Sequence, residues 1–200
     1  LPMKAARLIA AGAGLAAVGA AAAFAQYRQT EKPDYTSVRD DAEFELRDYP
    51  ALVVAEVSNA GTRERASGAS FRRLAAYIFA NDRPEGGEKI AMTAPVLQDE
   101  PRPGQWRMRF VMPSHYTLDT LPPAPDDITL TQMPARRMAA LRFSGNASDR
   151  DLALMEARLR DWMRQERLMP AGEAEFAFYD APMIPGPLRR NEVLIPVAAG

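Results

Sequence analysis

The sequence contains no cysteine and only one histidine, His115, and these absences exclude several kinds of functional site. Without cysteine the chain forms no disulfide, no thiolate metal site and no cysteine nucleophile. With one histidine it has neither a histidine cluster for zinc nor a choice of imidazoles for a Ser-His-Asp triad. No glycine-rich phosphate loop is present, and adjacent carboxylates such as Asp40 and Asp41 point in different directions on an extended chain. We therefore expect neither a metal site nor an enzyme.

The chain also lacks a strong net charge. Its 200 residues include 25 Lys and Arg against 26 Asp and Glu, which gives a formal net charge of −1. A protein without a basic field is not drawn onto nucleic acid, so we expect no nucleic-acid partner. The hydrophobic content of 47% is sufficient for a buried core, and the length suits one domain or two fused halves.

The N-terminal segment has the pattern of an export signal. Lys4 and Arg7 precede an uncharged run of about 18 residues, 8–25, which ends in an Ala-Phe-Ala cleavage sequence. Residues 1–25 are therefore either a removed signal peptide or a retained transmembrane helix that acts as a membrane anchor. The positive-inside rule keeps the basic end in the cytoplasm in both cases. We expect an exported, periplasmic protein, either soluble or tethered to the inner membrane through residues 8–25.

The rest of the chain contains the same order of elements twice. Residues 43–115 and 128–197 each comprise two strands, an amphipathic helix, an Ala-Pro pair and a closing strand. The Ala-Pro pairs end at Pro95 and Pro182, and matching features are separated by about 85 residues. Neither half buries its apolar faces alone. We predict an α+β fold for residues 42–200, with a curved or closed sheet of about eight strands and two helices outside it.

The segments around these halves are polar or rich in proline. Residues 26–41 are charged and contain Pro33, so we interpret them as a tether. The segment from His115 to Asp127 has too much proline for regular structure and is predicted to be a surface connector.

Apolar spacing and capping residues place the two helices. The first has apolar residues at positions 71, 74, 75, 78 and 79, which form one helical stripe. Gly68 weakens its early part, so the firm helix is predicted to begin near Ala69. The second begins after Ser148, an N-cap residue with Asp151 at the capping-box position.

Several segments together resemble the SOUL haem-binding protein family. They are residues 89–96, 110–114, 116–122, 143–145, 179–182 and 189–193, within a resemblance that extends from about Tyr35 to Val197. The resemblance implies a pseudo-symmetric α+β domain with a distorted eight-stranded barrel and two helices. It also implies binding of haem or a related tetrapyrrole.

The resemblance further implies a ligand that lies against the first helix, near the loop before the last strand. The positions that match are on the apolar side of that helix and in that loop: Phe71, Leu74, Ala75, Ile78, Arg189 and Arg190. His115 is the one imidazole that the chain offers as an axial ligand of haem iron. Its position in a turn is equally typical of an ordinary exposed histidine.

Three functions are consistent with these features. The first is a non-catalytic carrier or buffer that binds haem in a hydrophobic groove outside the cytoplasm. The second is a membrane-anchored accessory subunit that docks on a larger membrane complex and binds no haem. The third is the binding of a different apolar ligand in the same groove.

Overall fold

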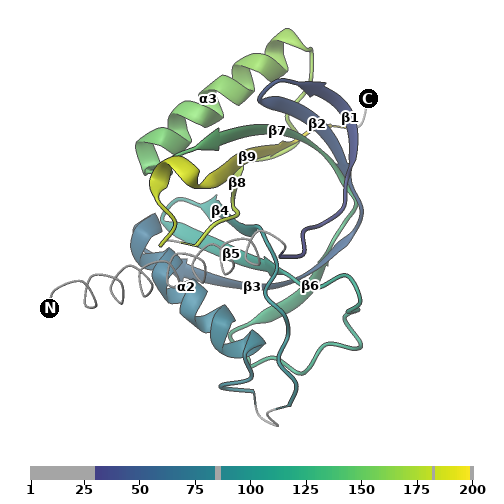
Figure 1. Cartoon of the computed structure of the whole chain (residues 1–200), viewed down its shortest axis with the longest axis vertical. Helices are drawn as coiled ribbons and strands as arrows, with labels where there is room; N and C mark the ends of the chain where they lie inside the picture. Colours follow the sequence, from purple (N-terminus) through teal and green to yellow (C-terminus); the bar gives the residue numbers. More distant parts are fainter. Residues whose placement is uncertain (1–29, 84–86, 182, 199–200) are drawn as a thin grey trace, which may run out of the picture. The chain divides into compact units, whose positions relative to one another are not determined.

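One antiparallel sheet of nine strands organises the structure, and two long helices lie on its outer side (Figure 1). The structure is a computed structural model that describes residues 30–83, 87–181 and 183–198. The predicted signal or anchor, residues 1–25, lies outside the described residues. In chain order the elements are β1 (Thr36–Asp41), β2 (Phe44–Tyr49), β3 (Leu52–Ala60), α2 (Arg63–Ile78), β4 (Val96–Arg102), β5 (Gln105–Val111), β6 (Thr129–Met133), β7 (Arg136–Ser144), α3 (Asp149–Gln165), β8 (Glu175–Phe178), the short 3-10 helix η1 (Gly186–Leu188) and β9 (Arg190–Pro196).

The order of strands in the sheet reveals the internal duplication. The order is β1-β2-β7-β9-β8-β4-β5-β3-β6. The strands β2, β3, β4 and β5 of the first half correspond in turn to β6, β7, β8 and β9 of the second. Swapping the labels of corresponding strands gives the same order read from the other end, from β6 to β2. The pseudo-twofold axis therefore lies between β4 and β8, and α2 corresponds to α3. Each half also exchanges its first strand with the other half, since β2 pairs with β7 and β6 pairs with β3.

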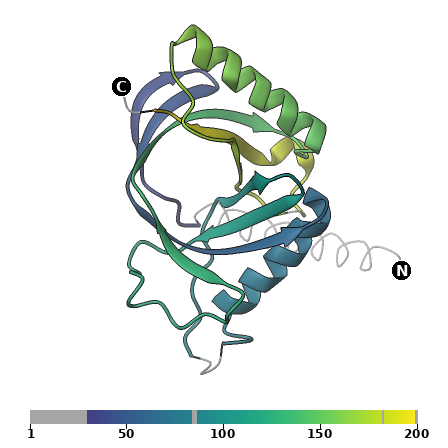
Figure 2. The same ribbon diagram turned by 180° about the vertical axis from the view of Figure 1, so that it is seen from behind.

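Alternation along the strands divides the apolar side chains between the two faces of the sheet. The sheet curls away from the helices, so its helix-free face is concave (Figures 1 and 2). A core cluster on the concave face includes Val54, Leu97, Val111, Met138 and Leu194. On the other face, one cluster joins α2 to the sheet and a second joins α3 to it. Each helix thus covers the convex face of its own half, and neither helix covers the concave face.

The sheet differs from the predicted eight-stranded barrel in one strand and in closure. The additional strand is β1, which falls in the segment interpreted as a tether and pairs with β2. All six of its residues are exposed, so the sequence carries no apolar alternation that marks it as a strand. Among the described strands no pairing joins β1 to β6, and the sheet is a curled half-barrel.

The helices begin where their N-cap residues lie. Ser148 accepts a hydrogen bond from the backbone N–H of Asp151, whose side chain accepts one from the backbone N–H of Ser148, so the predicted capping box of α3 is confirmed. The predicted start of α2 near Ala69 is wrong, because Thr62 caps a helix that begins at Arg63. The cost of Gly68 inside a helix is about 1 kcal/mol. Burial of Leu74 and Ile78 offsets it, at about 1.5–3 kcal/mol each.

The connections between the elements agree with the composition of the sequence. The predicted connector from His115 to Asp127 contains turns and no helix or strand. Tyr77 of α2 fastens it to the domain by donating a hydrogen bond to the carbonyl of Pro122, at 2.7 Å. Within the part of the chain that the structure describes, neither helix is long and apolar enough to cross a membrane.

Candidate functional site

The concave face of the sheet contains a cavity of about 350 Å³, a volume at the lower end of the range for small-molecule sites. Strands from both halves line it, together with the chain that leads into β1. Its apolar wall includes Leu52, Leu97, Val111 and Leu194. Its polar wall is dominated by arginine and tyrosine side chains.

A buried ion cluster forms the base of this polar wall. The guanidinium of Arg47, which is 1% exposed, donates to both carboxylate oxygens of Glu192 at 2.8 and 2.9 Å. Its Nε donates to Glu45 at 2.8 Å. Burial opposes the charge of Arg47, but the hydrogen bonds to Glu192 outweigh it, and the pKa of Arg47 is raised above its usual value. The cluster links β2 of the first half to β9 of the second.

Three tyrosines surround the cluster and remain uncharged. Tyr179 donates its hydroxyl hydrogen to Glu192 at 2.7 Å, and the hydroxyl of Tyr49 accepts from Arg47 at 3.0 Å. Burial raises the pKa of Tyr49 to about 12 and that of Tyr179 well above its ordinary value. The ring of Tyr35 lies 4.4 Å from the guanidinium carbon of Arg47 and 5.2 Å from the ring of Tyr49. The cavity therefore offers aromatic surface beside a fully paired carboxylate.

The predicted helix positions lie on α2, on the opposite side of the sheet. Leu74 and Ile78 are buried in the core beneath α2, where a ligand does not reach them. Phe71 is 42% exposed and contacts Phe110 of β5 at a centroid distance of 5.4 Å, and Ala75 is half-buried. Phe71 and Ala75 are thus the accessible members of this predicted set.

The predicted loop arginines are elsewhere. Arg189 donates to the carbonyl of Ile184 at 2.7 Å. Arg190 begins β9, lines the concave cavity and forms a two-point ion pair with Asp180. Because α2 covers the convex face, the structure does not bring Arg190 and the α2 residues to one surface. His115 is exposed in a turn with its ring against Tyr116, at 4.2 Å between centroids. Contact of any of these residues with a ligand stays a prediction.

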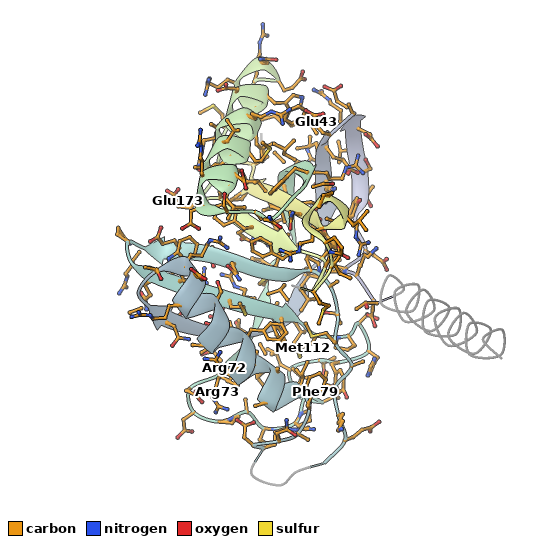
Figure 3. All side chains as sticks on the ribbon, turned by 60° about the vertical axis from the view of Figure 1, so that its left-hand side comes forward. Glu43, Arg72, Arg73, Phe79, Met112 and Glu173 are labelled. Carbon is orange, nitrogen blue, oxygen red and sulfur yellow. The ribbon has the colours of Figure 1, made fainter. Side chains whose placement is uncertain are left out.

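The accessible side of α2 includes one residue that the site prediction omitted. Phe79, the C-cap residue, is 41% exposed and lies two turns after Phe71, with Ala75 midway between them. Gly68 lies one turn before Phe71, and an added Cβ there would meet only the end of Arg72. Residues 68, 71, 75 and 79 thus alternate small and large side chains, and we call them the α2 ridge. Figure 3 shows Phe79 at the end of α2 and Arg72 and Arg73 projecting from the helix.

The spacing in the sequence already contained the signal for Phe79, which belongs to the same apolar stripe. Exposure separates the stripe into buried and accessible members, and exposure depends on how far the sheet extends beneath the helix. No group of three or more His, Cys, Asp or Glu side chains in the described residues is arranged to hold a metal ion.

Comparison with known proteins identifies a family and a fold. Residues 30–196 match the sequence profile of the family described as SOUL heme-binding protein. No curated protein matches the chain. Among solved structures, a hydrolase from Listeria innocua is similar over 80% of this chain and 94% of its own, with 12% identity and a TM-score of 0.56.

Another similar structure is the C-terminal domain of EcmrR, with 11% identity and a TM-score of 0.59 over 83% of this chain and 99% of that chain. EcmrR in a DNA complex has the same identity and TM-score over 78% of this chain and 57% of that chain. At these identities the structures share the fold with this chain, and the likeness carries no activity across.

Proposed function

The chain belongs to the SOUL haem-binding protein family, and from this premise we propose that it is a non-catalytic carrier or buffer of haem or a related tetrapyrrole. The observation that carries the proposal is the family match over nearly the whole described domain. The α2 ridge supports it, because it presents accessible aromatic surface on a rigid helix.

The α2 ridge fits the flat face of a macrocycle. Phe71 and Phe79 are both partly exposed, and the small residue Ala75 lies between them on the helix. Leu74 and Ile78 anchor the helix from below, so the ridge is held in place before a ligand arrives. Contact of a macrocycle with these side chains removes apolar surface from water, at about 25 cal/mol per Å².

Arginine side chains are available for the propionate groups. Arg72 is exposed on α2 and lies over Gly68, beside the α2 ridge. Arg73 is held by Asp127 and Asp82 and is therefore less available. A guanidinium pairs with a carboxylate through two parallel hydrogen bonds, which orients the ligand as well as binding it. Bound haem would supply its own redox-active iron, and His115 is the one imidazole that the chain offers to it.

The location of the carrier follows from the N-terminal pattern. We place the domain outside the cytoplasm, exported by residues 1–25 and either released or tethered to the inner membrane. The alternative of an accessory subunit docked on a membrane complex depends on that same segment, which lies outside the described residues. No observation on the described domain favours it.

A haemin titration of the full-length chain, followed by Soret absorbance, tests the proposal. We expect a saturable shift, and we expect Phe71→Ala/Phe79→Ala to weaken binding by about tenfold or more, since two apolar contacts are lost. Leu154→Ala is the matched control, because Leu154 is exposed on α3, the counterpart of α2. Absence of a saturable shift contradicts the proposal. Equal haemin affinity of the Phe71→Ala/Phe79→Ala variant and the Leu154→Ala control contradicts the α2 ridge as the binding surface. An Arg189→Ala/Arg190→Ala variant tests the predicted loop contacts in the same assay.

A further inference from the structure

We propose that the cavity in the concave face is a second binding site, which takes a small organic anion with a flat apolar body, such as an aryl carboxylate. The cavity and the α2 ridge lie on opposite faces of the sheet. The inference therefore concerns a ligand other than the proposed tetrapyrrole.

The charges on the cavity wall favour an anion. Among the described residues, its lining includes a single carboxylate, that of Glu192, and five basic side chains: Lys32, Arg47, Arg136, Arg142 and Arg190. Two hydrogen bonds from Arg47 and one from Tyr179 already occupy that carboxylate. A cationic ligand would meet several positive groups and no uncompensated negative one.

Apart from Glu192, the carboxylates that pair with the guanidinium groups of the wall lie outside the lining. Asp180 holds Arg190, Glu175 holds Arg136, and Glu45 holds Arg47. These pairs fix the guanidinium groups in the wall. A ligand in the cavity therefore meets positively charged groups in a preorganised arrangement.

Two basic groups are available to bind the ligand's charged end. Lys32 forms no ion pair with another described residue. Arg142 donates to the backbone carbonyl of Ala42 at 3.0 Å, and its nearest carboxylate oxygens, of Asp40 and Glu45, are 3.6 and 4.0 Å away. Both distances exceed those of a charge-assisted hydrogen bond, which is about 2.7–2.9 Å long. A carboxylate ligand supplies the short contact that these two groups lack.

The remaining wall fits an apolar body. Leu52, Leu97, Val111 and Leu194 contribute aliphatic surface, and Tyr35 and Tyr49 contribute rings. Since the tyrosine hydroxyl of Tyr49 and the carboxylate of Glu192 are bonded within the wall, the apolar and aromatic surface is left for the ligand. The volume of about 350 Å³ suits a molecule of one or two rings.

The test uses three ligands of nearly identical shape and different charge: 2-naphthoate, neutral 2-naphthamide and cationic 2-naphthylmethylammonium. Calorimetric titration of the full-length chain should show saturable binding of naphthoate, about tenfold or more tighter than that of the amide, because one charge-assisted interaction is lost. The ammonium compound should bind more weakly than either. Equal binding of naphthoate and the amide, or tighter binding of the ammonium compound, overturns the proposal.

Variants locate the site. Lys32→Gln/Arg142→Gln should weaken naphthoate by about tenfold and change amide binding by less than about twofold, a difference that a general loss of structure does not produce. Arg137→Gln is the matched control, since Arg137 is also on β7 with 46% of its side chain exposed, against 45% for Arg142, but lies outside the cavity lining. Unchanged naphthoate binding in the double variant overturns the assignment.

Competition establishes that the site is separate. Protein saturated with haemin should bind naphthoate with unchanged affinity, and displacement of naphthoate by haemin overturns the separation of the two sites. The naphthoate titrations contain no haemin, so their failure leaves the haem proposal untouched. Failure of the haemin titration equally leaves the cavity proposal standing.

Discussion

Arg47 is the side chain whose surroundings differ most from its usual role as a surface residue. It lies in the wall of the cavity between two glutamates. Its charge is retained because all three of its guanidinium nitrogens donate hydrogen bonds to acceptors in the protein. A buried ion cluster of this kind adds little net stability compared with apolar side chains, but removal of one partner strands the others. Replacing the whole cluster with apolar side chains should therefore cost little stability, whereas removing one member should cost much.

Arg47→Ala should lower the free energy of unfolding by about 3–5 kcal/mol, because Glu45 and Glu192 are left buried without their cation. Urea denaturation measures the loss. Arg137→Ala is the control, since it removes an exposed pair with Asp48 and should change little. Arg47→Met combined with Glu45→Gln and Glu192→Gln should recover part of the loss. Equal stability of the two single variants would contradict the role of the buried cluster.

The contact between Arg47 and Glu192 could not be predicted from the sequence. The two residues are 145 positions apart and belong to different halves. Alternation predicts which side of a strand a residue occupies, whereas the contact depends on β2 and β9 both pairing with β7. The cavity could not be derived from motifs for the same reason, since its lining comes from eight separate segments of chain or more.

At the level of elements, the two helices are related by the pseudo-twofold axis but are capped differently. In α3, the Ser148 side chain and Asp151 form a reciprocal capping box, with the Asp151 N–H at 3.2 Å from Ser148 Oγ. Hydrogen bonding from Ser148 lowers the pKa of Asp151, so this carboxylate stays ionised at the positive end of the helix. In α2, the corresponding bond from Arg65 to Thr62 is 3.5 Å long.

Ser148→Ala should therefore destabilise the protein by about 1 kcal/mol, the usual effect of removing a good N-cap. Thr62→Ala should have a smaller effect, because the bond that it removes is long and lacks the reciprocal partner. Thermal unfolding followed by circular dichroism compares the two variants. A larger loss for Thr62→Ala would show that the capping box does not determine the stability of these helix ends.

The elements that the sequence predicted well are those with a buried face. The helix after Ser148 carries a clear pattern, and it begins at the predicted position. The element that it missed, β1, is exposed on both faces and held by its backbone pairing with β2. Backbone hydrogen bonds of an edge strand depend on a neighbour that local composition does not reveal.

For the whole molecule, the exchange of first strands makes the halves interdependent. Phe44 of the first half pairs with Leu141 of the second, and Leu52 with Met133. In an isolated first half, β2 lacks its partner β7 and β3 lacks its partner β6, and the isolated second half lacks the same two pairings. Each half then exposes strand edges that are paired in the intact sheet. The repeat could be predicted from the sequence, but this exchange could not, because alternation does not say which strands are neighbours.

We therefore expect that fragments 32–115 and 128–198 do not fold alone and that the intact chain unfolds in one cooperative transition. Circular dichroism of each fragment, and of an equimolar mixture, tests this. Recovery of the native spectrum in the mixture agrees with the exchanged sheet, and a cooperative melting transition in either isolated half contradicts it. The intact domain, measured under the same conditions, is the control.

The position of β9 has a consequence for the order of events during synthesis. β9 lies inside the sheet between β7 and β8, yet it follows every other described strand in the sequence. Until the ribosome has added residues 190–196, the apolar side of α3 and the edges of β7 and β8 have no completed partner. Folding of the second half is therefore delayed until its last strand emerges.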